Sequence, residues 1–201
     1  ILGVNDPFID VAYAAYMLKY DTMHGHFEGT VEVDGNALVV NGKKVVFFAE
    51  KDPSAIDWKS CGAEYIVEST GVFCTTEKAS AHFNGGAKKV VISAPAGNDL
   101  PTIVYSVNEK TLTADDTIIS AASCTTNCLA PMAKALNDYA PIQSGIMSTI
   151  HAYTGDQMIL DGPHRKGDLR RARAGAANIV PNSTGAAKAI GLVIPELNGK
   201  L

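Results

Sequence analysis

The sequence predicts an α/β fold in which a largely parallel sheet is covered by helices. Short apolar runs rich in Val and Ile alternate with stretches of helical periodicity, which is the pattern of strands joined by helical crossovers. Apolar residues make up 46% of the 201 residues and charged residues 19%, so the chain has enough apolar material for a hydrophobic core. The same balance excludes an intrinsically disordered chain. No apolar run reaches the ~18 residues that a membrane-spanning helix needs.

Residues 1–4 form an apolar, strand-like run, and a helix is expected directly after it. Asp6 can serve as the N-cap of this helix, and Pro7 suits its first turn because backbone N–H groups there lack intrahelical partners. The expected apolar stripe comprises Phe8, Val11, Ala12, Ala15 and Leu18. Three further runs should pair antiparallel, because tight-turn pairs separate them. The runs are residues 30–33, 37–40 and 44–49, and the turn pairs are Gly35-Asn36 and Asn41-Gly42.

Strands and one helix are expected to alternate from residue 64 to residue 121. The expected strands are residues 64–68, 89–94, 102–107 and 117–121. Residues 76–83 predict a helix that ends at Gly85-Gly86, since glycine favours the left-handed conformation that terminates helices. His82 falls near the end of that helix, where the helix dipole favours a cation.

The last third of the chain has a different pattern. Its expected elements are a helix over residues 124–138 capped by Ser123, a strand over residues 145–151 and a helix over residues 183–191. Residues 155–180 have no clear period and many Arg and Gly residues, which is typical of a long loop. Because the pattern changes near residue 123, we expect two domains, residues 1–123 and residues 124–201.

The sharpest local signal is Cys124, which lies where an expected strand runs into an expected helix. Backbone N–H groups in the first turn of a helix lack intrahelical partners, and the helix dipole adds partial positive charge. That environment stabilises a thiolate, so we expect the pKa of Cys124 to lie below the free value of about 8.5. The alternative is a small buried residue, which is the usual state of a cysteine.

Cys128 lies one helical turn beyond Cys124, so a disulfide between them or half of a metal site is conceivable. Cys61 and Cys74 stand alone in other segments, and no second Cys or His pair has ligand spacing. We therefore expect no metal site and place Cys128 in the core. Four cysteines are too few for a disulfide scaffold. Free thiols are typical of a reducing compartment, so the expected location is the cytoplasm.

A nucleophilic thiol needs a base, and His151 is the candidate among five histidines. It ends an apolar run and precedes a polar cluster, and the ends of strands are where α/β proteins gather functional groups. His24 and His26 flank a glycine in a turn and are expected to face solvent, and His164 lies in the long loop. Position alone leaves both a functional and a structural role open for His151.

Six short motifs follow one another along the chain. The most specific are Ser-Cys-Thr-Thr-Asn-Cys (residues 123–128) and His-Ala-Tyr-Thr-Gly-Asp-Gln (residues 151–157). The others are Asn5-Asp6-Pro7-Phe8, Glu68-Ser69-Thr70-Gly71, Ile92-Ser93-Ala94-Pro95 and Ser183-Thr184-Gly185-Ala186-Ala187-Lys188. In sequence and order they resemble the glyceraldehyde-3-phosphate dehydrogenase family. The resemblance implies a doubly wound, Rossmann-type NAD-binding domain, incomplete at its N-terminus, and then the first part of an α+β catalytic domain.

The resemblance implies that Cys124 and His151 are catalytic. The thiolate would attack the aldehyde carbon of glyceraldehyde 3-phosphate, and His151 would take a proton as hydride leaves for the nicotinamide. Inorganic phosphate would then displace the resulting thioester. By motif match, the pocket for this attacking phosphate comprises Ser123, Thr125, Thr184 and Gly185. Thr154, with Asp156 nearby, resembles the side of the site that binds the substrate phosphate.

Residues 161–173 hold five basic residues and two aspartates. The plain interpretation is a solvated charged face. Nucleic-acid binding is not expected, because aromatic residues are absent there and the net charge of the chain is −4. The segment resembles the family's loop that lines the active site and a neighbouring subunit's cofactor. Arg171, and less closely Arg173, is similar to a phosphate-contacting arginine, a role that suits its fixed donor fork.

The resemblance also implies NAD as the cofactor. Asp6 follows an expected strand at the place where an acid hydrogen-bonds the adenosine ribose, and its charge would repel the 2′-phosphate of NADP. The same residue could also cap the following helix. Ser69, Thr70 and Ser93 match cofactor-side positions. Lys51 stands where the family commonly has Arg, so its contact with the cofactor is expected through the backbone.

Both ends of the chain are expected to be cut from a longer one. The family's glycine-rich phosphate loop and first strand should precede Ile1, and part of the catalytic domain should follow Leu201. We therefore expect the 201 residues alone to bind NAD weakly and to turn over little. The family suggests a homotetramer. The alternatives are a related phosphorylated-aldose dehydrogenase of the erythrose-4-phosphate type, a non-catalytic nucleotide-binding protein, and a cysteine hydrolase, which would explain neither the first half nor the basic loop.

Overall fold

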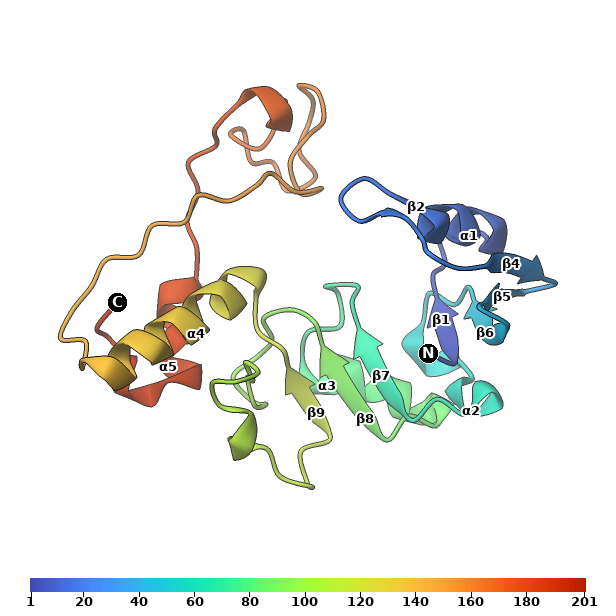
Figure 1. The fold of residues 1–201 in the computed structure, drawn as a ribbon, viewed down its shortest axis with the longest axis horizontal. Helices are drawn as coiled ribbons and strands as arrows, with labels where there is room; N and C mark the ends of the chain where they lie inside the picture. The colour runs from blue at the N-terminus through green and yellow to red at the C-terminus, as the bar shows by residue number, and fades with distance from the viewer. The chain divides into compact units, whose positions relative to one another are not determined.

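The chain divides into two compact units, Ile1–Ser123 and Cys124–Leu201. A computed structural model describes residues 1–201, and Figure 1 traces the chain from one end to the other. The first unit holds the described sheets, and the second holds the two longer helices that follow residue 123. None of the helices combines the length and the apolar character that crossing a bilayer requires.

The first sheet has the strand order β1-β6-β5-β4. Its strands are β1 (Gly3–Asn5), β4 (Val31–Asp34), β5 (Ala37–Val40) and β6 (Lys43–Phe48). The last three pair antiparallel, whereas β1 runs parallel to β6, with Val4 opposite Phe47. The two turns use left-handed residues, with φ of 58° at Gly35 and 48° at Asn41, so the predicted turn pairs are confirmed. A separate pair of short strands follows the first helix, β2 (Tyr20–Asp21) and β3 (Gly25–His26).

Helix α1 (Val11–Lys19) begins later than the sequence predicts. Its N-cap is Asp10, whose carboxylate accepts a hydrogen bond from Tyr13 N at 2.7 Å. Asp6 accepts from Phe8 N at 2.9 Å instead, and this local turn carries the chain away from β1 before the helix starts. The prediction of Asp6 as the N-cap is therefore wrong. Phe8 lies outside the helix and is exposed, while Ala15 is buried as expected.

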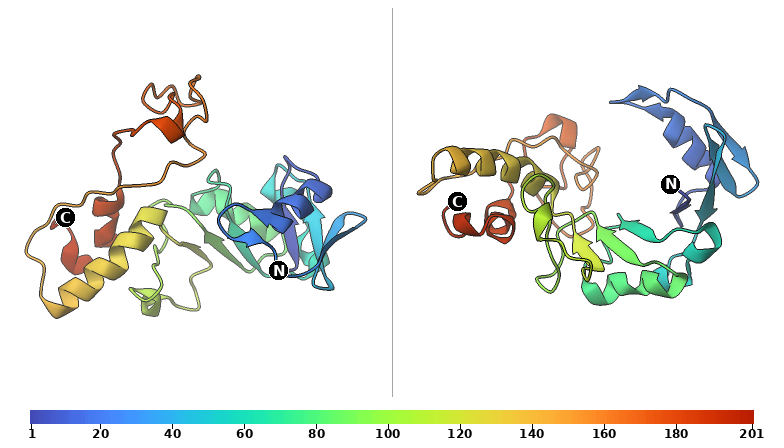
Figure 2. Two further views of the ribbon diagram at one scale, coloured as in Figure 1. Left: turned by 45° about the horizontal axis from the view of Figure 1, so that its top comes forward. Right: turned by 60° about the horizontal axis from the view of Figure 1, so that its bottom comes forward.

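The second sheet is parallel, with the order β7-β8-β9. Its strands are β7 (Tyr65–Glu68), β8 (Lys89–Ile92) and β9 (Ile118–Ser120). Around it lie η1 (Pro53–Ala55), α2 (Trp58–Cys61), α3 (Thr76–Ala79), η2 (Ser80–Gly85) and η3 (Glu109–Thr111). Residues of α2 and α3 pack with the strands in one core, and Figure 2 shows the backbone of the chain from two further directions. Most of that core is buried apolar side chains: Ile56, Trp58, Ile66, Ala79, Ala87, Val90, Ile92 and Ile118.

Two expectations for this part of the chain need correction. The helix expected over residues 76–83 is α-helical only to Ala79 and continues as the 3-10 helix η2 to Gly85. Residues 102–107 form no strand, only an isolated bridge from Thr102 to Ser120. The Asn108 side chain donates to Thr102 O at 2.9 Å and accepts from Val104 N at 2.8 Å. These bonds close a turn and replace the bonds that a strand would give to a neighbour.

Ile92 is completely buried in the central strand of this sheet. We expect Ile92→Ala to lower the free energy of unfolding of the full-length protein by about 2–5 kcal/mol, because the truncated side chain leaves a cavity. Urea denaturation measures the change. Val67→Thr on β7 is the control, since Val67 is 65% exposed, and its effect should stay within about 0.5 kcal/mol. Equal losses in the two variants would contradict the assigned core.

The second unit is built on α4 (Cys124–Tyr139) and α5 (Ala186–Val193), with η4 (Gly175–Ala177) and η5 (Pro195–Leu197) as short 3-10 turns. The helices pack together through buried apolar residues: Ala130, Ala133, Ile190, Val193 and Leu197. The strand expected over residues 145–151 does not form, and Ile146 and Ile150 are fully exposed. A strand needs a hydrogen-bonded neighbour, and no strand pairs with this segment. That prediction is therefore wrong for this chain.

Candidate active site

Cys124 is the first residue of α4. It follows a sharp bend, because Ala122 has a φ of 60°. The first N–H groups of any α-helix have no partner within the helix and give that end a partial positive charge. Cys124 is exposed at this end, so the alternative of a small buried cysteine is wrong. Ser123 is half-buried, and its expected role as the helix cap stays a prediction.

His151 faces the thiol of Cys124. The distance from Cys124 Sγ to His151 Nε2 is 3.5 Å. On the other side of the ring, Nδ1 lies 2.7 Å from the carbonyl oxygen of Ala152. A carbonyl can only accept, so Nδ1 carries a hydrogen and donates it, which leaves Nε2 to exchange a proton with the sulfur. The backbone carbonyl of the residue after His151 therefore orients the ring.

The two side chains shift each other's titration. The hydrogen bond with His151 lowers the pKa of Cys124, and bonds with Thr125 lower it further against a partial burial that raises it. The Ala152 carbonyl raises the pKa of His151, and the contact with Cys124 raises it further. Both directions favour a thiolate beside an imidazolium. The pKa of Cys124 is lowered as expected, and the largest cause is its hydrogen bond with His151.

A cavity of about 810 Å³ opens in front of this pair. Many of the residues singled out in the sequence line it: Cys124, Thr125, His151, Thr154, Asp156, Arg171 and Thr184. Gly185 does not line the cavity but precedes α5 at its N-cap position, next to Thr184. The Thr184 hydroxyl accepts from Ala186 N at 3.2 Å. Segments that are up to 60 residues apart in sequence therefore meet within the second unit.

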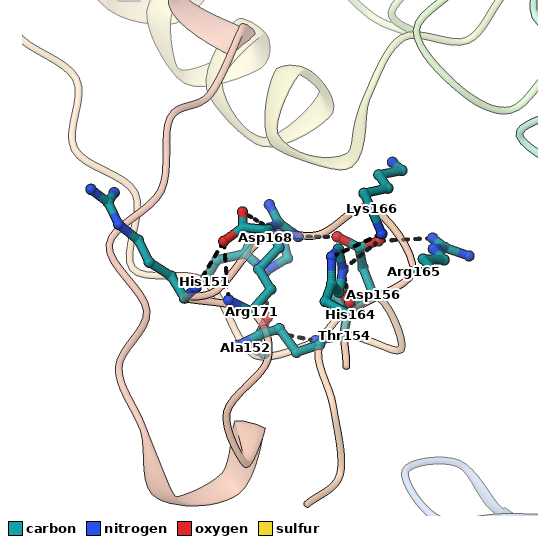
Figure 3. A network of polar contacts seen from close by, with 11 residues as sticks. His151, Ala152, Thr154, Asp156, His164, Arg165, Lys166, Asp168 and Arg171 are labelled. Atoms are coloured by element: carbon teal, nitrogen blue, oxygen red, sulfur yellow. Dashed lines mark hydrogen bonds and ion pairs between the residues drawn. The ribbon is translucent and has the colours of Figure 1, made fainter. Parts of the chain in front are cut away.

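The basic loop is folded around Asp156 (Figure 3). Arg165 donates to Asp156 Oδ1 at 2.8 Å, and Arg171 donates to Asp156 Oδ2. Arg171 also lies 3.6 Å from Asp168 through Nε. Hydrogen bonding to Arg165 and the charge of Arg171 hold the pKa of Asp156 below its usual value, against some burial. His164 is buried, and its Nε2 lies 2.8 Å from the backbone carbonyl oxygen of Asp156.

Arg173 is placed differently from Arg171. It pairs with Asp161 at 3.0 Å, and it does not line the cavity. A role of Arg173 in contacting phosphate stays a prediction. The loop is thus organised by ion pairs, most of them to Asp156. A solvated charged face describes only its exposed side chains; Arg165, for example, is exposed although it pairs with Asp156.

Two family models match the chain. One, described as the NAD binding domain of glyceraldehyde 3-phosphate dehydrogenase, matches residues 1–76, and one described as the C-terminal domain of that enzyme matches residues 123–201. The glyceraldehyde-3-phosphate dehydrogenases of Podospora anserina and Neurospora crassa are 63% and 62% identical to it over 201 residues. The Streptococcus pyogenes enzyme is 63% identical over 202 residues. The chain belongs to the glyceraldehyde-3-phosphate dehydrogenase family.

These alignments cover 100% of the chain and 59% to 60% of the relatives' length. The chain thus spans about three fifths of a glyceraldehyde-3-phosphate dehydrogenase. The family resemblance predicted from the motifs is confirmed, and so is the α/β fold class with an NAD-binding domain followed by a catalytic domain.

The first unit holds the residues that the family likeness places beside the cofactor. They follow parallel strands at their carboxyl ends: Asp6 after β1, Lys51 after β6, Ser69 and Thr70 after β7, and Ser93 after β8. β1 and β6 belong to the first sheet, and β7 and β8 belong to the second; the carboxyl ends of such parallel strands are where α/β proteins bind dinucleotides. Asp6 uses Oδ1 for Phe8 N, so Oδ2 remains able to accept from a ribose hydroxyl. Lys51, Ser69, Thr70 and Ser93 are exposed. The residues present therefore fit a dinucleotide.

The structure places two residues differently from the sequence analysis, and it gives a third, Glu68, a role that was not predicted. Cys128 is exposed on α4 and not in the core. His82, expected near a helix end as a favourable cation, is buried against Glu68 and Trp58. Glu68 itself was not singled out. The sequence does offer one signal for it, a carboxylate at the end of an apolar run. Burying such a carboxylate is costly unless it is hydrogen-bonded, so its position predicts buried donors nearby.

Proposed function

We propose that the protein is the phosphorylating glyceraldehyde-3-phosphate dehydrogenase of glycolysis, which uses NAD to oxidise glyceraldehyde 3-phosphate to 1,3-bisphosphoglycerate. The observation that carries the proposal is the contact of 3.5 Å between Cys124 Sγ and His151 Nε2, both of which line a cavity of about 810 Å³. It lies in a chain that is 60% to 63% identical to enzymes of that name.

In the first step the Cys124 thiolate attacks the aldehyde carbon. A C–S bond forms, and the carbonyl oxygen takes a proton to give a hemithioacetal on Cys124. His151 is placed to hold that proton, because its Nδ1 is bonded to Ala152 O and its Nε2 faces the sulfur. NAD, when bound, supplies the acceptor for the hydride of the same carbon.

As the hydride leaves, His151 takes the hydroxyl proton and a thioester remains on Cys124. Inorganic phosphate then attacks the thioester carbon, the C–S bond breaks, and the thiolate is regenerated. Ser123, Thr125, Thr184 and Gly185 are proposed to hold this phosphate. Thr184 and Gly185 stand before the first turn of α5, where unpaired N–H groups favour an anion.

The substrate phosphate is proposed to bind on the side of Thr154, Asp156 and Arg171. All three line the cavity. Arg171 is held by Asp156 and Asp168, so its guanidinium is oriented before an anion arrives, and only part of its donor fork is used by the carboxylates. Asp156 acts there as a positioning residue and not as a phosphate ligand.

Residues 1–123 are proposed as the NAD-binding domain and residues 124–201 as the first part of the catalytic domain. Asp6 would accept from the adenosine ribose, and Ser69, Thr70 and Ser93 would contact the cofactor. Lys51 would do so through its backbone. We also propose a cytoplasmic homotetramer, which size-exclusion chromatography with light scattering would test.

Replacing Arg171 with lysine keeps the positive charge but removes the planar guanidinium, so it tests whether the geometry of the donor fork contributes to substrate binding. We expect Arg171→Lys to raise KM for glyceraldehyde 3-phosphate by about 10- to 100-fold, because a point charge cannot span Asp156, Asp168 and a phosphate as the fork does. Steady-state kinetics measure the change. Arg173→Lys is the matched control in the same loop and should stay within about twofold. An equal rise of KM in both variants would contradict the proposed role.

The decisive experiment on the function traps the acyl enzyme. The full-length protein is mixed with glyceraldehyde 3-phosphate and NAD without inorganic phosphate, quenched in acid and digested for mass spectrometry. The expected result is a phosphoglyceroyl adduct on the peptide that contains Cys124 and Cys128, with fragmentation of that peptide locating the adduct on Cys124. An active enzyme with no adduct on that peptide, or with the adduct on Cys61, Cys74 or Cys128, would refute the proposal.

A further inference from the structure

A buried carboxylate lies beneath the turn that follows β7. Glu68, the last residue of that strand, is only 3% exposed. Its Oε2 lies 2.9 Å from His82 Nε2, and Trp58 Nε1 lies 3.1 Å from His82 Nδ1. An indole N–H can only donate, so Nδ1 accepts and the imidazole hydrogen lies on Nε2. His82 therefore donates to Glu68, and Trp58 determines the tautomer.

The other carboxylate oxygen holds the turn itself. Thr70 donates to Glu68 Oε1 through its backbone N–H at 2.8 Å and through its hydroxyl. The Thr70 hydroxyl accepts in turn from Val72 N at 3.1 Å. Burial would raise the pKa of Glu68, but the hydrogen bonds from His82 and Thr70 outweigh it and the pKa is lowered. Glu68 is thus an ionised group whose two oxygens serve neutral donors.

Glu68 also reaches the neighbouring strand. Its backbone carbonyl accepts from Ser93 N at 2.9 Å, and Ser93 is the first residue after β8. Any residue at position 68 could make this backbone bond, so only the turn that carries Thr70 depends on the Glu68 side chain. An apolar side chain at this position would leave Thr70 N and His82 Nε2 without acceptors, which is costly in a buried site.

We infer that Glu68, held by His82 and Trp58, is a positioning residue that sets the Thr70 turn for the dinucleotide. The inference rests on the proposed NAD-binding role of this edge. It adds a specific consequence for Thr70. Its hydroxyl hydrogen is donated inward to Glu68, so the hydroxyl can meet a ligand only as an acceptor. The exposed donors at these turns are then backbone N–H groups and the hydroxyls of Ser69 and Ser93.

The test compares variants of the full-length protein by NAD binding and by kinetics. In Glu68→Gln the carboxylate becomes an amide that cannot accept from all three donors. We expect the calorimetric Kd and the KM for NAD to rise about tenfold, with kcat within about twofold. Val67→Thr is the matched control on the opposite, exposed face of β7 and should leave both constants unchanged.

Two substitutions at His82 test whether its hydrogen bonds to Glu68 and Trp58 contribute to NAD binding. His82→Leu removes the donor to Glu68 and the acceptor for Trp58, so we expect a similar rise of Kd. In His82→Gln an amide nitrogen can donate to Glu68 and an amide oxygen can accept from Trp58. This variant should bind NAD within about threefold of the wild type, a rescue that the donor pattern explains.

The outcomes separate positioning from mere packing. If Glu68→Gln and His82→Leu lower the melting temperature but leave Kd for NAD unchanged, the trio is structural and the inference falls. If either variant fails to fold, Trp58→Phe decides, because it removes the N–H that sets the His82 tautomer and leaves every residue proposed to contact NAD in place; an unchanged Kd overturns the inference and a raised one supports it. A wild-type protein that binds NAD but does not oxidise glyceraldehyde 3-phosphate would refute the proposed function alone. A wild-type protein that binds no NAD overturns the inference.

Discussion

Replacing Cys124 with serine should lower kcat/KM for glyceraldehyde 3-phosphate by about 10⁴-fold or more. The sulfur lies at the first turn of α4 and within 3.5 Å of His151 Nε2, and both features lower the pKa of a thiol. A serine hydroxyl in the same position stays protonated, since its pKa lies far above the range that a histidine and a helix end can shift. The initial rate of NADH formation by the full-length protein measures the loss.

Cys128→Ser is the matched control for this variant. Cys128 is exposed one helical turn along α4, and it does not line the cavity, so activity should stay within about twofold. Circular dichroism and the melting temperature show whether both variants are folded. A folded Cys124→Ser protein that keeps a tenth of the wild-type rate would remove Cys124 from the mechanism.

The position of Cys124 at a helix start and the lowering of its pKa could be predicted from sequence because both depend on nearby groups. A cysteine at the start of a helix gains its environment from the next few backbone groups, and α4 begins at Cys124 as predicted. The turn pairs near Gly35 and Asn41 were predictable for the same reason, because a positive φ is a property of one or two residues. His151 was only a candidate, since its distance from the sulfur depends on the path of the residues in between.

The start of α1 depended on a local choice between two caps, and the remaining features depended on contacts between distant segments. Asp6 and Asp10 are both good caps, and the turn of Asp6 onto Phe8 N decides between them. Residues 145–151 have the composition of a strand, but a strand forms only beside another. His82 reads as a polar residue of a surface helix, yet it lies against Glu68, 14 residues earlier in the chain. The residues next to His82 and next to Glu68 in sequence give no indication that these two side chains meet.

The second large effect is expected for His151→Asn, with kcat reduced by about 10²- to 10⁴-fold. The asparagine can keep a hydrogen bond near the sulfur, but it can neither take the hydroxyl proton nor carry a positive charge. The variant should also change the pH dependence of alkylation at Cys124. In the wild type the contact with His151 lowers the pKa of Cys124, so the thiolate persists as the pH falls below the ordinary value of about 8.5.

Without the imidazolium the pKa of Cys124 should rise toward that ordinary value. The rate of iodoacetamide labelling then falls as soon as the pH drops below about 8.5, while the wild-type rate holds at lower pH. Peptide mapping follows Cys124 apart from Cys61, Cys74 and Cys128, which serve as internal controls. A loss of kcat with an unshifted labelling profile would leave His151 as a base that does not ionise the thiol. An unshifted profile with normal kcat would remove His151 from the mechanism, because the contact of 3.5 Å would then have no chemical consequence.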